Sequence, residues 1–237
     1  MQKYEIYATF NFKFSKMCGR YSFAVEDELI KERFGVSVRS AVYKARYNCA
    51  PSQNLAVITN TEPGILNFFR WGLVPFWAKD AKTGNKLINA RSESILEKPS
   101  FRNAFRKRRC LVPADGFYEW RQPDKTPFRI LLKDREPFSM AGIWEEWNDP
   151  EGGILRTFSI LTTGPNELME NIHNRMPVIL QPGDEGKWLN ETSEIELNGL
   201  LKPFPPEGMM AYPVSRLVNS PSNDNPALLD LAGGMLL

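Results

Sequence analysis

Residues 55–59 read Leu55-Ala56-Val57-Ile58-Thr59, a short run of apolar and β-branched side chains that is followed by Asn60. Such a run is typical of a β-strand. The same pattern returns further along the chain, where each run is again short, apolar or β-branched and bounded by Pro, Gly or Asn. These runs lie at 65–71, 129–132, 138–144 and 157–163. The sequence therefore predicts a protein in which strands dominate.

Helical patterns are shorter and are scattered between these strands. Residues 26–34 carry Leu29, Ile30 and Phe34 among charged side chains, and Gly35 follows at the position where helices commonly end. Further helical patches are expected at 92–96, 100–106, 167–172 and about 183–190, and a polar loop at 80–85. Strands with scattered helices, and no regular βαβ alternation, indicate the α+β class.

No internal repeat and no Gly/Ser-rich or charge-rich linker divides the 237 residues. We therefore expect a single compact domain at 17–222, with a curved, barrel-like, mostly antiparallel sheet flanked by helices. Residues 1–16 are expected to be an N-terminal extension, because they lack the apolar centre and cleavage site of a secretory signal. A mis-assigned start, a removed leader and an additional strand all remain open for this extension. Residues 225–237 contain no informative motif, and residues 223–237 are expected to be a C-terminal tail.

The composition, 42% hydrophobic and 24% charged, is ordinary for a soluble globular protein. No stretch approaches the ~20 apolar residues that span a bilayer, so a cytoplasmic protein without membrane contact is expected. The net charge of +2 does not by itself indicate a nucleic-acid binder. The basic run at 102–109 could contact phosphates, and it fits a solvated helix face equally well.

Three cysteines, Cys18, Cys49 and Cys110, leave one unpaired under any disulfide scheme, and their spacing matches no structural zinc pattern. Because the chain has a single histidine, we expect no metal site, and nothing in the sequence implies an organic cofactor. Cys49 and Cys110 lie in apolar sequence, which predicts small buried side chains. Cys18 differs from both because it follows Met17, a possible start residue.

Four stretches combine polar, chemically useful side chains within apolar sequence. They are Met17-Cys18-Gly19-Arg20-Tyr21, Asn89-Ala90-Arg91-Ser92-Glu93, Pro113-Ala114-Asp115-Gly116-Phe117-Tyr118-Glu119-Trp120 and His173-Asn174-Arg175-Met176-Pro177. Together they supply a thiol, a carboxamide, a carboxylate, an imidazole and guanidinium groups, which suffice for covalent chemistry beside a phosphate backbone. In this order the stretches resemble the SRAP family, the SOS-response-associated peptidases that process abasic sites in DNA. The resemblance runs from about residue 17 to residue 220.

The resemblance implies the SRAP fold and a crosslink to abasic sites in single-stranded DNA through the cysteine that follows the initiator methionine. Here that cysteine matches Cys18. A cysteine at the first position of a chain carries an α-amine and a thiol on adjacent carbons, and both groups titrate near physiological pH, at about 8 and 8.5. Such an aminothiol converts an aldehyde into an imine and then into a thiazolidine. Residues 1–17 would have to be removed first, by autoproteolysis or through a start at Met17.

The family match assigns catalytic roles to Cys18, Asn89, Glu119 and His173. Glu119 is embedded in apolar sequence, where desolvation would favour proton transfer, although a structural salt bridge would look the same. The ordinary imidazole pKa of about 6.5 suits His173 for proton transfer, although a lone histidine is often structural. Asn89 can donate to a sugar or phosphate oxygen and accept from the α-amine.

The predicted DNA contacts are Arg20, Pro51, Trp71, Trp77, Arg91 and Arg175. The arginines suit bidentate phosphate binding, and the alternative for each is an ordinary ion pair. Residues 71–77, Trp71-Gly72-Leu73-Val74-Pro75-Phe76-Trp77, resemble the family's stretch at the border of the bound DNA, which predicts a partly exposed, base-stacking Trp71. The alternative for Trp71 is a place in the core.

The leading hypothesis is an abasic-site sensor of the DNA-damage and SOS response that binds single-stranded DNA. We expect it to act as a monomer and to be nucleoid-associated when bound to DNA. A secondary lyase activity is also expected. A second hypothesis is a thiol peptidase or amidohydrolase for other substrates, with Cys18, His173 and Glu119 as its catalytic groups. A third is a noncatalytic single-strand-binding module.

Overall fold

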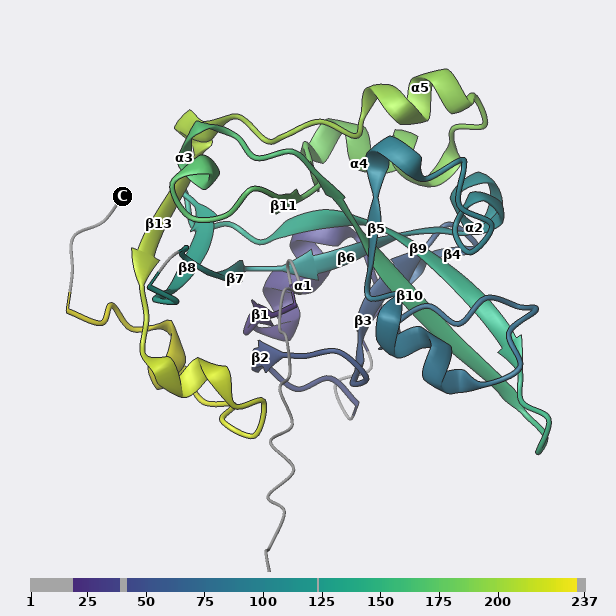
Figure 1. Ribbon diagram of the computed structural model, residues 1–237, viewed down its shortest axis with the longest axis horizontal. Helices are drawn as coiled ribbons and strands as arrows, with labels where there is room; N and C mark the ends of the chain where they lie inside the picture. Colours follow the sequence, from purple (N-terminus) through teal and green to yellow (C-terminus); the bar gives the residue numbers. More distant parts are fainter. Residues whose placement is uncertain (1–18, 39–41, 123, 234–237) are drawn as a thin grey trace, which may run out of the picture.

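The computed structural model describes residues 19–38, 42–122 and 124–233 (Figure 1). The strands are β1 (Tyr21–Phe23), β2 (Arg46–Cys49), β3 (Asn54–Thr59), β4 (Glu62–Trp71), β5 (Asn89–Arg91), β6 (Arg109–Ala114), β7 (Gly116–Trp120), β8 (Pro127–Leu132), β9 (Phe138–Asn148), β10 (Ile154–Thr163), β11 (Met176–Pro177), β12 (Ile179–Leu180) and β13 (Met209–Pro213). The α-helices are α1 (Asp27–Phe34), α2 (Arg102–Lys107), α3 (Glu167–Glu170), α4 (Pro182–Asn190) and α5 (Glu194–Gly199). Short 3-10 helices include η1 (Ala81–Lys86) and η2 (Ser92–Ser94).

Five of the described strands close into a small barrel. Strand β3 pairs with β4 on one side and with β6 on the other, and β6 pairs in turn with β9. Strand β10 pairs with β9 and also with β4, which completes the ring. All of these pairs are antiparallel except β10–β4. The predicted α+β fold with a barrel-like, mostly antiparallel sheet in one compact domain is confirmed.

A second, antiparallel sheet has the strand order β13-β8-β7-β1-β2. Its side chains alternate between two apolar clusters, as the period of a strand requires. Phe117, Ile130 and Ala211 belong to the main core, whereas their neighbours Tyr118, Leu131 and Tyr212 belong to a smaller cluster with Val214, Val218 and Leu228. Both faces of the sheet are therefore covered, which explains why β7 is apolar at almost every position.

Two short strands extend the carboxyl end of β10. Strand β5 runs parallel to it, with Arg91 in register with Thr162, and β11 runs antiparallel on its other side, with Pro177 in register with Thr162. Figure 1 shows β5 and β11 meeting β10 in this region. The polar stretches at 89–93 and 173–177 are thereby brought to one place in the fold.

The five expected strands are all present, and each is longer than the sequence indicates. The helix expected at 26–34 spans Asp27–Phe34, and Gly35 ends it in the left-handed conformation with φ 64°. The expected polar loop at 80–85 is instead the 3-10 helix η1, where the Asp80 side chain accepts a hydrogen bond from Lys82 N. The patches at 92–96 and 167–172 contain only one short turn of helix each.

The C-terminal segment packs against the second sheet as far as it is described. Leu228 is fully buried, Leu231 forms a β-bridge with Val214, and Asp224 accepts hydrogen bonds from Tyr47 N and Asn48 N. Residues 223–233 therefore belong structurally to the compact unit and are not a detached tail. The expected extension at 1–16 lies outside the described residues. Within the described ranges, no helix is long and apolar enough to cross a membrane.

Candidate active site

The residue bonded to Cys18 lies beside Glu119, although Cys18 itself is outside the described residues. Strand β1 pairs with β7 through Tyr21 and Phe117, and Tyr118 N donates to Arg20 O at 2.9 Å. Continued by one residue, this antiparallel register sets Gly19 opposite Glu119. Glycine 19 is the first residue of the described chain. The sheet thus holds the chain that follows Cys18 next to the candidate carboxylate.

Glu119 is nearly completely buried, with 2% of its surface exposed. It lies on β7 in register with Phe128 of β8, and strand alternation puts it on the same face as Phe117, toward the main core. Carboxylates this deeply buried are uncommon outside ion pairs and active sites. Its burial fits a role in the chemistry and fits a structural ion pair equally well.

His173 follows helix α3 and is half-buried. The preceding carbonyl, Ile172 O, accepts from Gln122 N at 3.2 Å, which ties this segment to the chain that leaves β7. The imidazole Nδ1 accepts a hydrogen bond from Arg175 N at 3.2 Å. Because Nδ1 acts as an acceptor, the neutral ring carries its proton on Nε2. The hydrogen bond to Nδ1 therefore orients the ring, and Nε2–H can donate a proton.

Asn89 and Arg91 lie on β5, opposite Ile160 and Thr162 of β10. Alternation puts both side chains on one face, while Ala90 between them is buried in the core. Asn89 is half-buried and Arg91 is exposed. The carboxamide is thus set within the site, and the guanidinium faces solvent at its edge.

Arg175 is held by an ion pair. Its Nη1 and Nη2 donate to the two carboxylate oxygens of Glu93 at 2.5 and 3.0 Å, and Nη2 also donates to Thr162 O at 2.7 Å. Hydrogen bonding from Arg175 holds the pKa of Glu93 below its ordinary value. The sequence interpretation assigned no role to Glu93, although it lies in the same stretch as Asn89 and Arg91. The ion-pair alternative therefore describes Arg175 in this structure.

Arg20 is partly buried and is also engaged within the protein. Its Nη1 donates to Asn48 Oδ1 at 2.8 Å and to Val218 O at 2.6 Å, and its guanidinium lies 5.9 Å from the centre of the Trp120 ring. Burial lowers the pKa of Arg20. The sequence interpretation missed Asn48, whose only signal was its place three residues before the predicted contact Pro51. Pro51 itself is half-exposed.

The predicted partial exposure of Trp71 is wrong. Only 1% of its surface is exposed, its Nε1 donates to Ile88 O at 2.9 Å, and its ring stacks against Phe158 with an interplanar angle of 11°. Tyr21 covers it from another side, with ring centroids 5.3 Å apart. The pairing of β4 with β10 draws Trp71 into the core, so it cannot stack on a DNA base in this structure.

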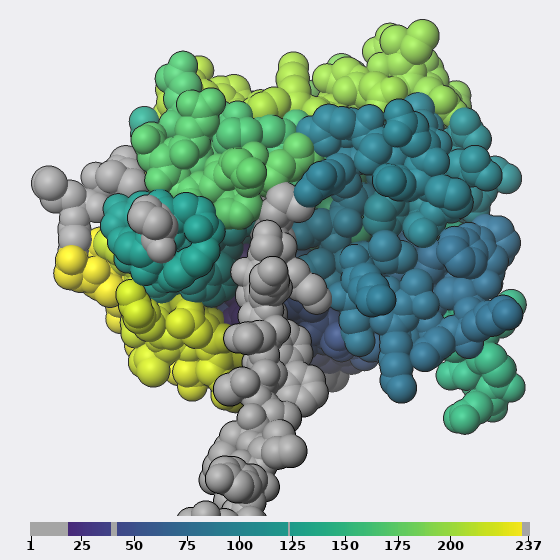
Figure 2. All heavy atoms as spheres, viewed as in Figure 1, coloured from purple at the N-terminus to yellow at the C-terminus, as the bar shows by residue number. Residues whose placement is uncertain are grey.

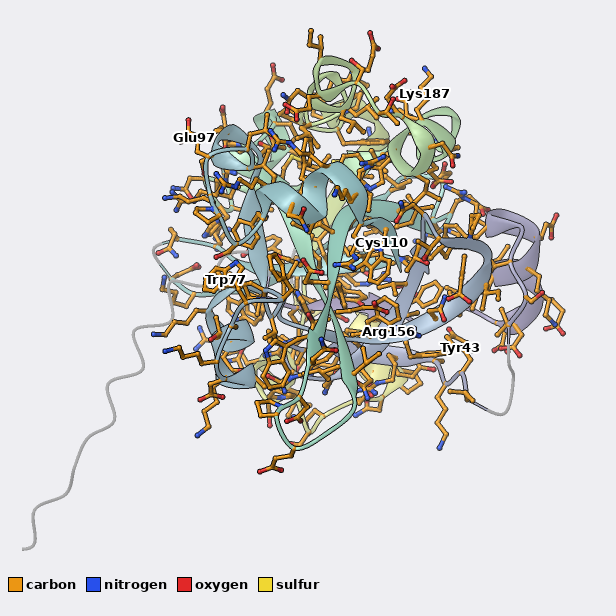
Figure 3. The ribbon with its side chains drawn as sticks, turned by 90° about the vertical axis from the view of Figure 1, so that its right-hand side faces the viewer. Tyr43, Trp77, Glu97, Cys110, Arg156 and Lys187 are labelled. Atoms are coloured by element: carbon orange, nitrogen blue, oxygen red, sulfur yellow. The ribbon has the colours of Figure 1, made fainter. Side chains whose placement is uncertain are left out.

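Trp77 is the exposed aromatic side chain of the same stretch. It is 52% exposed and Phe76 is 57% exposed, and Figure 3 shows Trp77 at the periphery of the molecule. Exposed cations follow this pair along the chain, namely Lys79, Lys82, Lys86 and Arg91. The only acid between 76 and 91 is Asp80. Exposed aromatic rings among unbalanced cations are suited to single-stranded nucleic acid.

The segments that carry these residues share one face of the molecule. Figure 2 shows the blue surface of the stretch around 76–100 together with the green segment near 165–175 and the teal turn between β7 and β8. The site residues other than Cys18 are therefore distributed over neighbouring elements: Arg20 and Glu119 on the second sheet, and Asn89, Arg91, His173 and Arg175 around the end of β10.

The basic run at 102–109 is largely used for internal contacts. Arg106 pairs with Glu194, Arg108 pairs with Glu145, and Arg109 donates to Phe105 O and Trp188 O. Arg102 and Lys107 are exposed. This pattern favours a structural role for most of the run.

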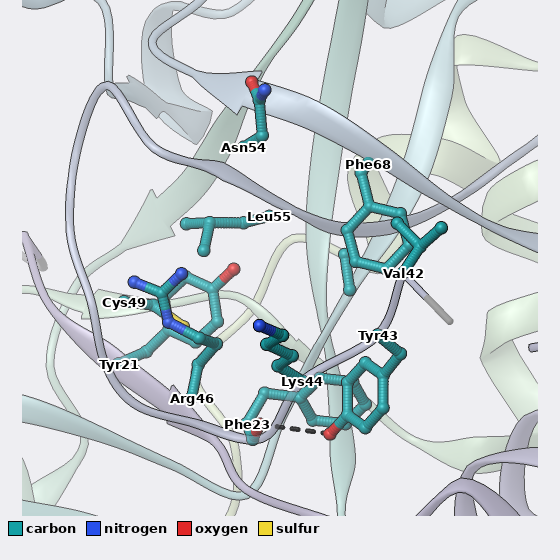
Figure 4. A pocket seen from close by; sticks show the side chains of 11 residues that line it. Tyr21, Phe23, Val42, Tyr43, Lys44, Arg46, Cys49, Asn54, Leu55 and Phe68 are labelled. Atoms are coloured by element: carbon teal, nitrogen blue, oxygen red, sulfur yellow. Dashed lines mark hydrogen bonds between the residues drawn. The ribbon is translucent and has the colours of Figure 1, made fainter. Parts of the chain in front are cut away.

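Neither described cysteine is a suitable nucleophile. Cys49 and Cys110 are buried, and burial raises the pKa of both thiols well above the ordinary value. Cys49 faces a small pocket of about 120 Å³ between β1, β2 and β3, where Lys44 and Arg46 are the cations (Figure 4). Within the described ranges, no group of His, Cys, Asp and Glu could hold a metal ion. Cys18 is thus the remaining candidate for thiol chemistry.

The chain is similar in sequence to proteins that are named abasic site processing proteins. The chain is 49% identical over 222 residues to abasic site processing protein YoqW of Bacillus subtilis, covering 90% of this chain and 99% of that protein. It is 34% identical over 230 residues to abasic site processing protein HMCES of Gallus gallus, covering 81% and 68%.

A protein of known crystal structure from Bacteroides thetaiotaomicron has a similar fold, with a TM-score of 0.82 and 35% identity over 91% of this chain and all of that one. Another, from Bordetella bronchiseptica, has a TM-score of 0.74 and 28% identity over 84% of this chain and all of that one. The family model for SOS response associated peptidase (SRAP) matches residues 17–221. The chain therefore belongs to the SRAP family.

Proposed function

We propose that the protein binds single-stranded DNA at an abasic site and forms a covalent thiazolidine crosslink through Cys18. The observation that carries this proposal is the antiparallel pairing of β1 with β7, which sets Gly19, the residue after Cys18, opposite the buried carboxylate of Glu119. Relatives from Bacillus subtilis, Gallus gallus and Saccharomyces cerevisiae bear the name abasic site processing protein, which supports the choice of substrate.

The crosslink needs only groups that Cys18 and the substrate supply. The ring-opened deoxyribose of an abasic site exposes an aldehyde. The α-amine of Cys18 adds to the aldehyde carbon, and loss of the carbonyl oxygen as water leaves an imine. The thiolate then forms a C–S bond to the same carbon while the nitrogen takes up a proton. One aldehyde and one aminothiol thus yield one thiazolidine and one water, with no oxidant or metal required.

The α-amine of Cys18 must be free for this reaction, so we propose that the peptide bond between Met17 and Cys18 is first hydrolysed, with one water consumed. The same side chains would serve both steps. Glu119, beside Gly19, would accept and return protons at the amine, and His173 would donate from Nε2 to the departing oxygen. Asn89 would orient the amine or the sugar through its carboxamide.

DNA binding would use the exposed cations and aromatics between residues 76 and 91. Trp77 would stack on a base next to the abasic gap, and Arg91 would contact a phosphate. Strand cleavage by β-elimination from the imine is proposed as a secondary activity, because the imine forms before the thiol closes on it. A role in the SOS response would follow from the substrate.

Intact-protein mass spectrometry tests the proposal. The full chain is incubated with a single-stranded oligonucleotide that carries one abasic site, alongside Cys18→Ala, Glu119→Gln and the control variants Cys49→Ala and Glu136→Gln. We expect the wild type to begin at Cys18 and to gain the mass of the oligonucleotide less one water. The gain should vanish in Cys18→Ala, slow by 10²-fold or more in Glu119→Gln, and persist in both controls.

Other outcomes would contradict the proposal. A chain that keeps residues 1–17 and gains no mass would exclude the aminothiol mechanism. Turnover of peptide substrates by such a chain would support a thiol peptidase instead. Unchanged DNA affinity with no adduct in any variant would indicate a noncatalytic binding module.

A further inference from the structure

Both terminal nitrogens of the Arg175 guanidinium are already bound to protein acceptors. Both terminal nitrogens bind the two oxygens of Glu93, in the fork geometry that a phosphate would require. Nη2 is further used by the main-chain oxygen and the hydroxyl of Thr162, at 2.7 and 3.2 Å. The Arg175 side chain is only 13% exposed, whereas that of Glu93 is 55% exposed. A phosphate could take this fork only by displacing Glu93.

These contacts join three elements around the end of β10. Glu93 belongs to η2, which follows β5, while Thr162 lies on β10 and Arg175 immediately precedes β11. Thr162 is fully buried. Arg175, which precedes β11, therefore connects to β10 through Thr162 and to η2 through its ion pair with Glu93.

The main chain of Arg175 acts on the histidine. Arg175 N donates to His173 Nδ1, two residues earlier, at 3.2 Å. The orientation of this amide depends on the path of residues 173–175, which is fixed at Arg175 by its side-chain contacts and beyond it by the pairing of Met176 with Thr163. Loss of the carboxylate at 93 would release the side-chain anchor and weaken the hydrogen bond that holds the imidazole.

We propose that Glu93 is a positioning residue for His173, which it holds through Arg175 as a ring with Nδ1 accepting and Nε2 protonated. Arg175 then acts as an anchor of the site through its contacts to Glu93 and Thr162. The importance of the orientation for catalysis rests on the proposed function, because it matters only if His173 transfers protons. The orientation itself is independent of that function and can be measured without DNA.

The single histidine makes the measurement direct. In the full chain with ¹⁵N-labelled histidine, two-bond ¹H–¹⁵N correlation spectra report which ring nitrogen carries the proton, at a pH high enough to keep the ring neutral. We expect the wild type to show mainly the Nε2–H form. In Glu93→Gln the ratio of the two neutral forms should fall several-fold toward that of a free imidazole. Glu97→Gln, an exposed acid on the same segment, should match the wild type.

Glu93→Asp provides a second variant that keeps the charge, and it should retain more of the Nε2–H preference than Glu93→Gln does. Far-UV circular dichroism checks that each variant is folded. If both variants are folded and give the wild-type spectrum, the proposal is overturned. It is also overturned if Glu93→Gln leaves the spectrum unchanged but raises DNA affinity and steepens its salt dependence, since Glu93 would then be a competitor of phosphate.

The two proposals fail in different ways. A wild type that forms no adduct with abasic DNA, but whose histidine responds to Glu93→Gln, would reject the proposed function and leave the positioning of His173 intact. A wild type that forms the adduct, with a histidine insensitive to residue 93, would do the reverse. If both proposals are correct, Glu93→Gln should also slow adduct formation about tenfold, with no loss of DNA affinity.

Discussion

Arg20 Nη1 donates to Asn48 Oδ1 at 2.8 Å, and this bond connects the chain that leads into β1 to strand β2. The side-chain nitrogen Nδ2 of Asn48 in turn donates to three carbonyls of the C-terminal segment, Val218 O, Ser220 O and Asn223 O. The fully buried side chain of Asn48 thus holds Arg20, the residue that precedes β1, and connects it to the C-terminal segment. Arg20, close to the candidate nucleophile Cys18, and Asn48 on β2 are thus held by residues about 170 to 200 positions later in the sequence.

Replacement of Asn48 by alanine should lower the free energy of unfolding by about 2 kcal/mol, because it leaves buried donors and acceptors without partners. Urea titration followed by tryptophan fluorescence measures the change. Asn190→Ala, at an exposed helix end, should alter the same quantity by less than about 0.5 kcal/mol. Equal effects of the two substitutions would show that the buried network contributes little.

Trp71→Ala should lower the free energy of unfolding by about 3–5 kcal/mol, as expected when a large buried aromatic side chain leaves a cavity. The same urea titration measures it. The remaining folded protein should bind DNA as the wild type does. A specific loss of DNA affinity at unchanged stability would mean that Trp71 becomes exposed in the complex.

Trp77→Ala should behave in the opposite way, because this side chain is half-exposed. Its stability should stay within about 0.5 kcal/mol of the wild type, while binding of a single-stranded oligonucleotide weakens by about 1–3 kcal/mol through loss of a stacked base. Fluorescence anisotropy with a labelled oligonucleotide measures the affinity. Ile195→Ala, an exposed apolar side chain on α5, provides the control. An unchanged affinity in Trp77→Ala would move the stacking contact elsewhere.

Arg91→Gln should weaken DNA binding and lower the slope of log affinity against log salt by about 0.7, the value for one phosphate contact on a single strand. Lys31→Gln on α1 removes the same charge outside the proposed DNA face and should leave the slope unchanged. Anisotropy titrations over a series of salt concentrations give both slopes. Equal slopes for wild type and Arg91→Gln would exclude a phosphate contact at this position.

The Glu93–Arg175 pair should make stability depend on pH. Hydrogen bonding from Arg175 lowers the pKa of Glu93 in the folded protein, so the pair stabilises the fold above the unfolded carboxyl pKa of about 4.3 and loses this effect as pH falls through the folded value. After discounting for solvent screening of the half-exposed carboxylate, the contribution at neutral pH is about 0.5–1 kcal/mol. The difference in unfolding free energy between wild type and Glu93→Gln should shrink on acidification. A constant difference would show that the charge on Glu93 is not involved.

The location of the strands was predictable because short apolar runs bounded by turn residues carry their own signal. The pairing that closes the predicted barrel was not, since β10 pairs with its sequence neighbour β9 and also with β4, which lies far earlier in the sequence. The sequence also failed to show that residues 223–233 complete the domain. Asp224 makes its contacts to main-chain amides of β2, and such partners leave no mark in the side-chain pattern.

The sequence by itself determined the family, because the order and content of its four polar stretches identify it, and the family supplied the candidate groups of the site. The tertiary structure alone decided which of these groups face solvent. Trp71 and Trp77 lie six residues apart in one apolar stretch, yet pairing of β4 with β10 buries the first and leaves the second exposed. Arg91 lies in register with Thr162 on β5, whereas Arg175 donates to Thr162 O, and of the two arginines it is Arg175 that forms the ion pair with Glu93. Local sequence does not encode these differences, because each arises from contacts between segments that the fold brings together.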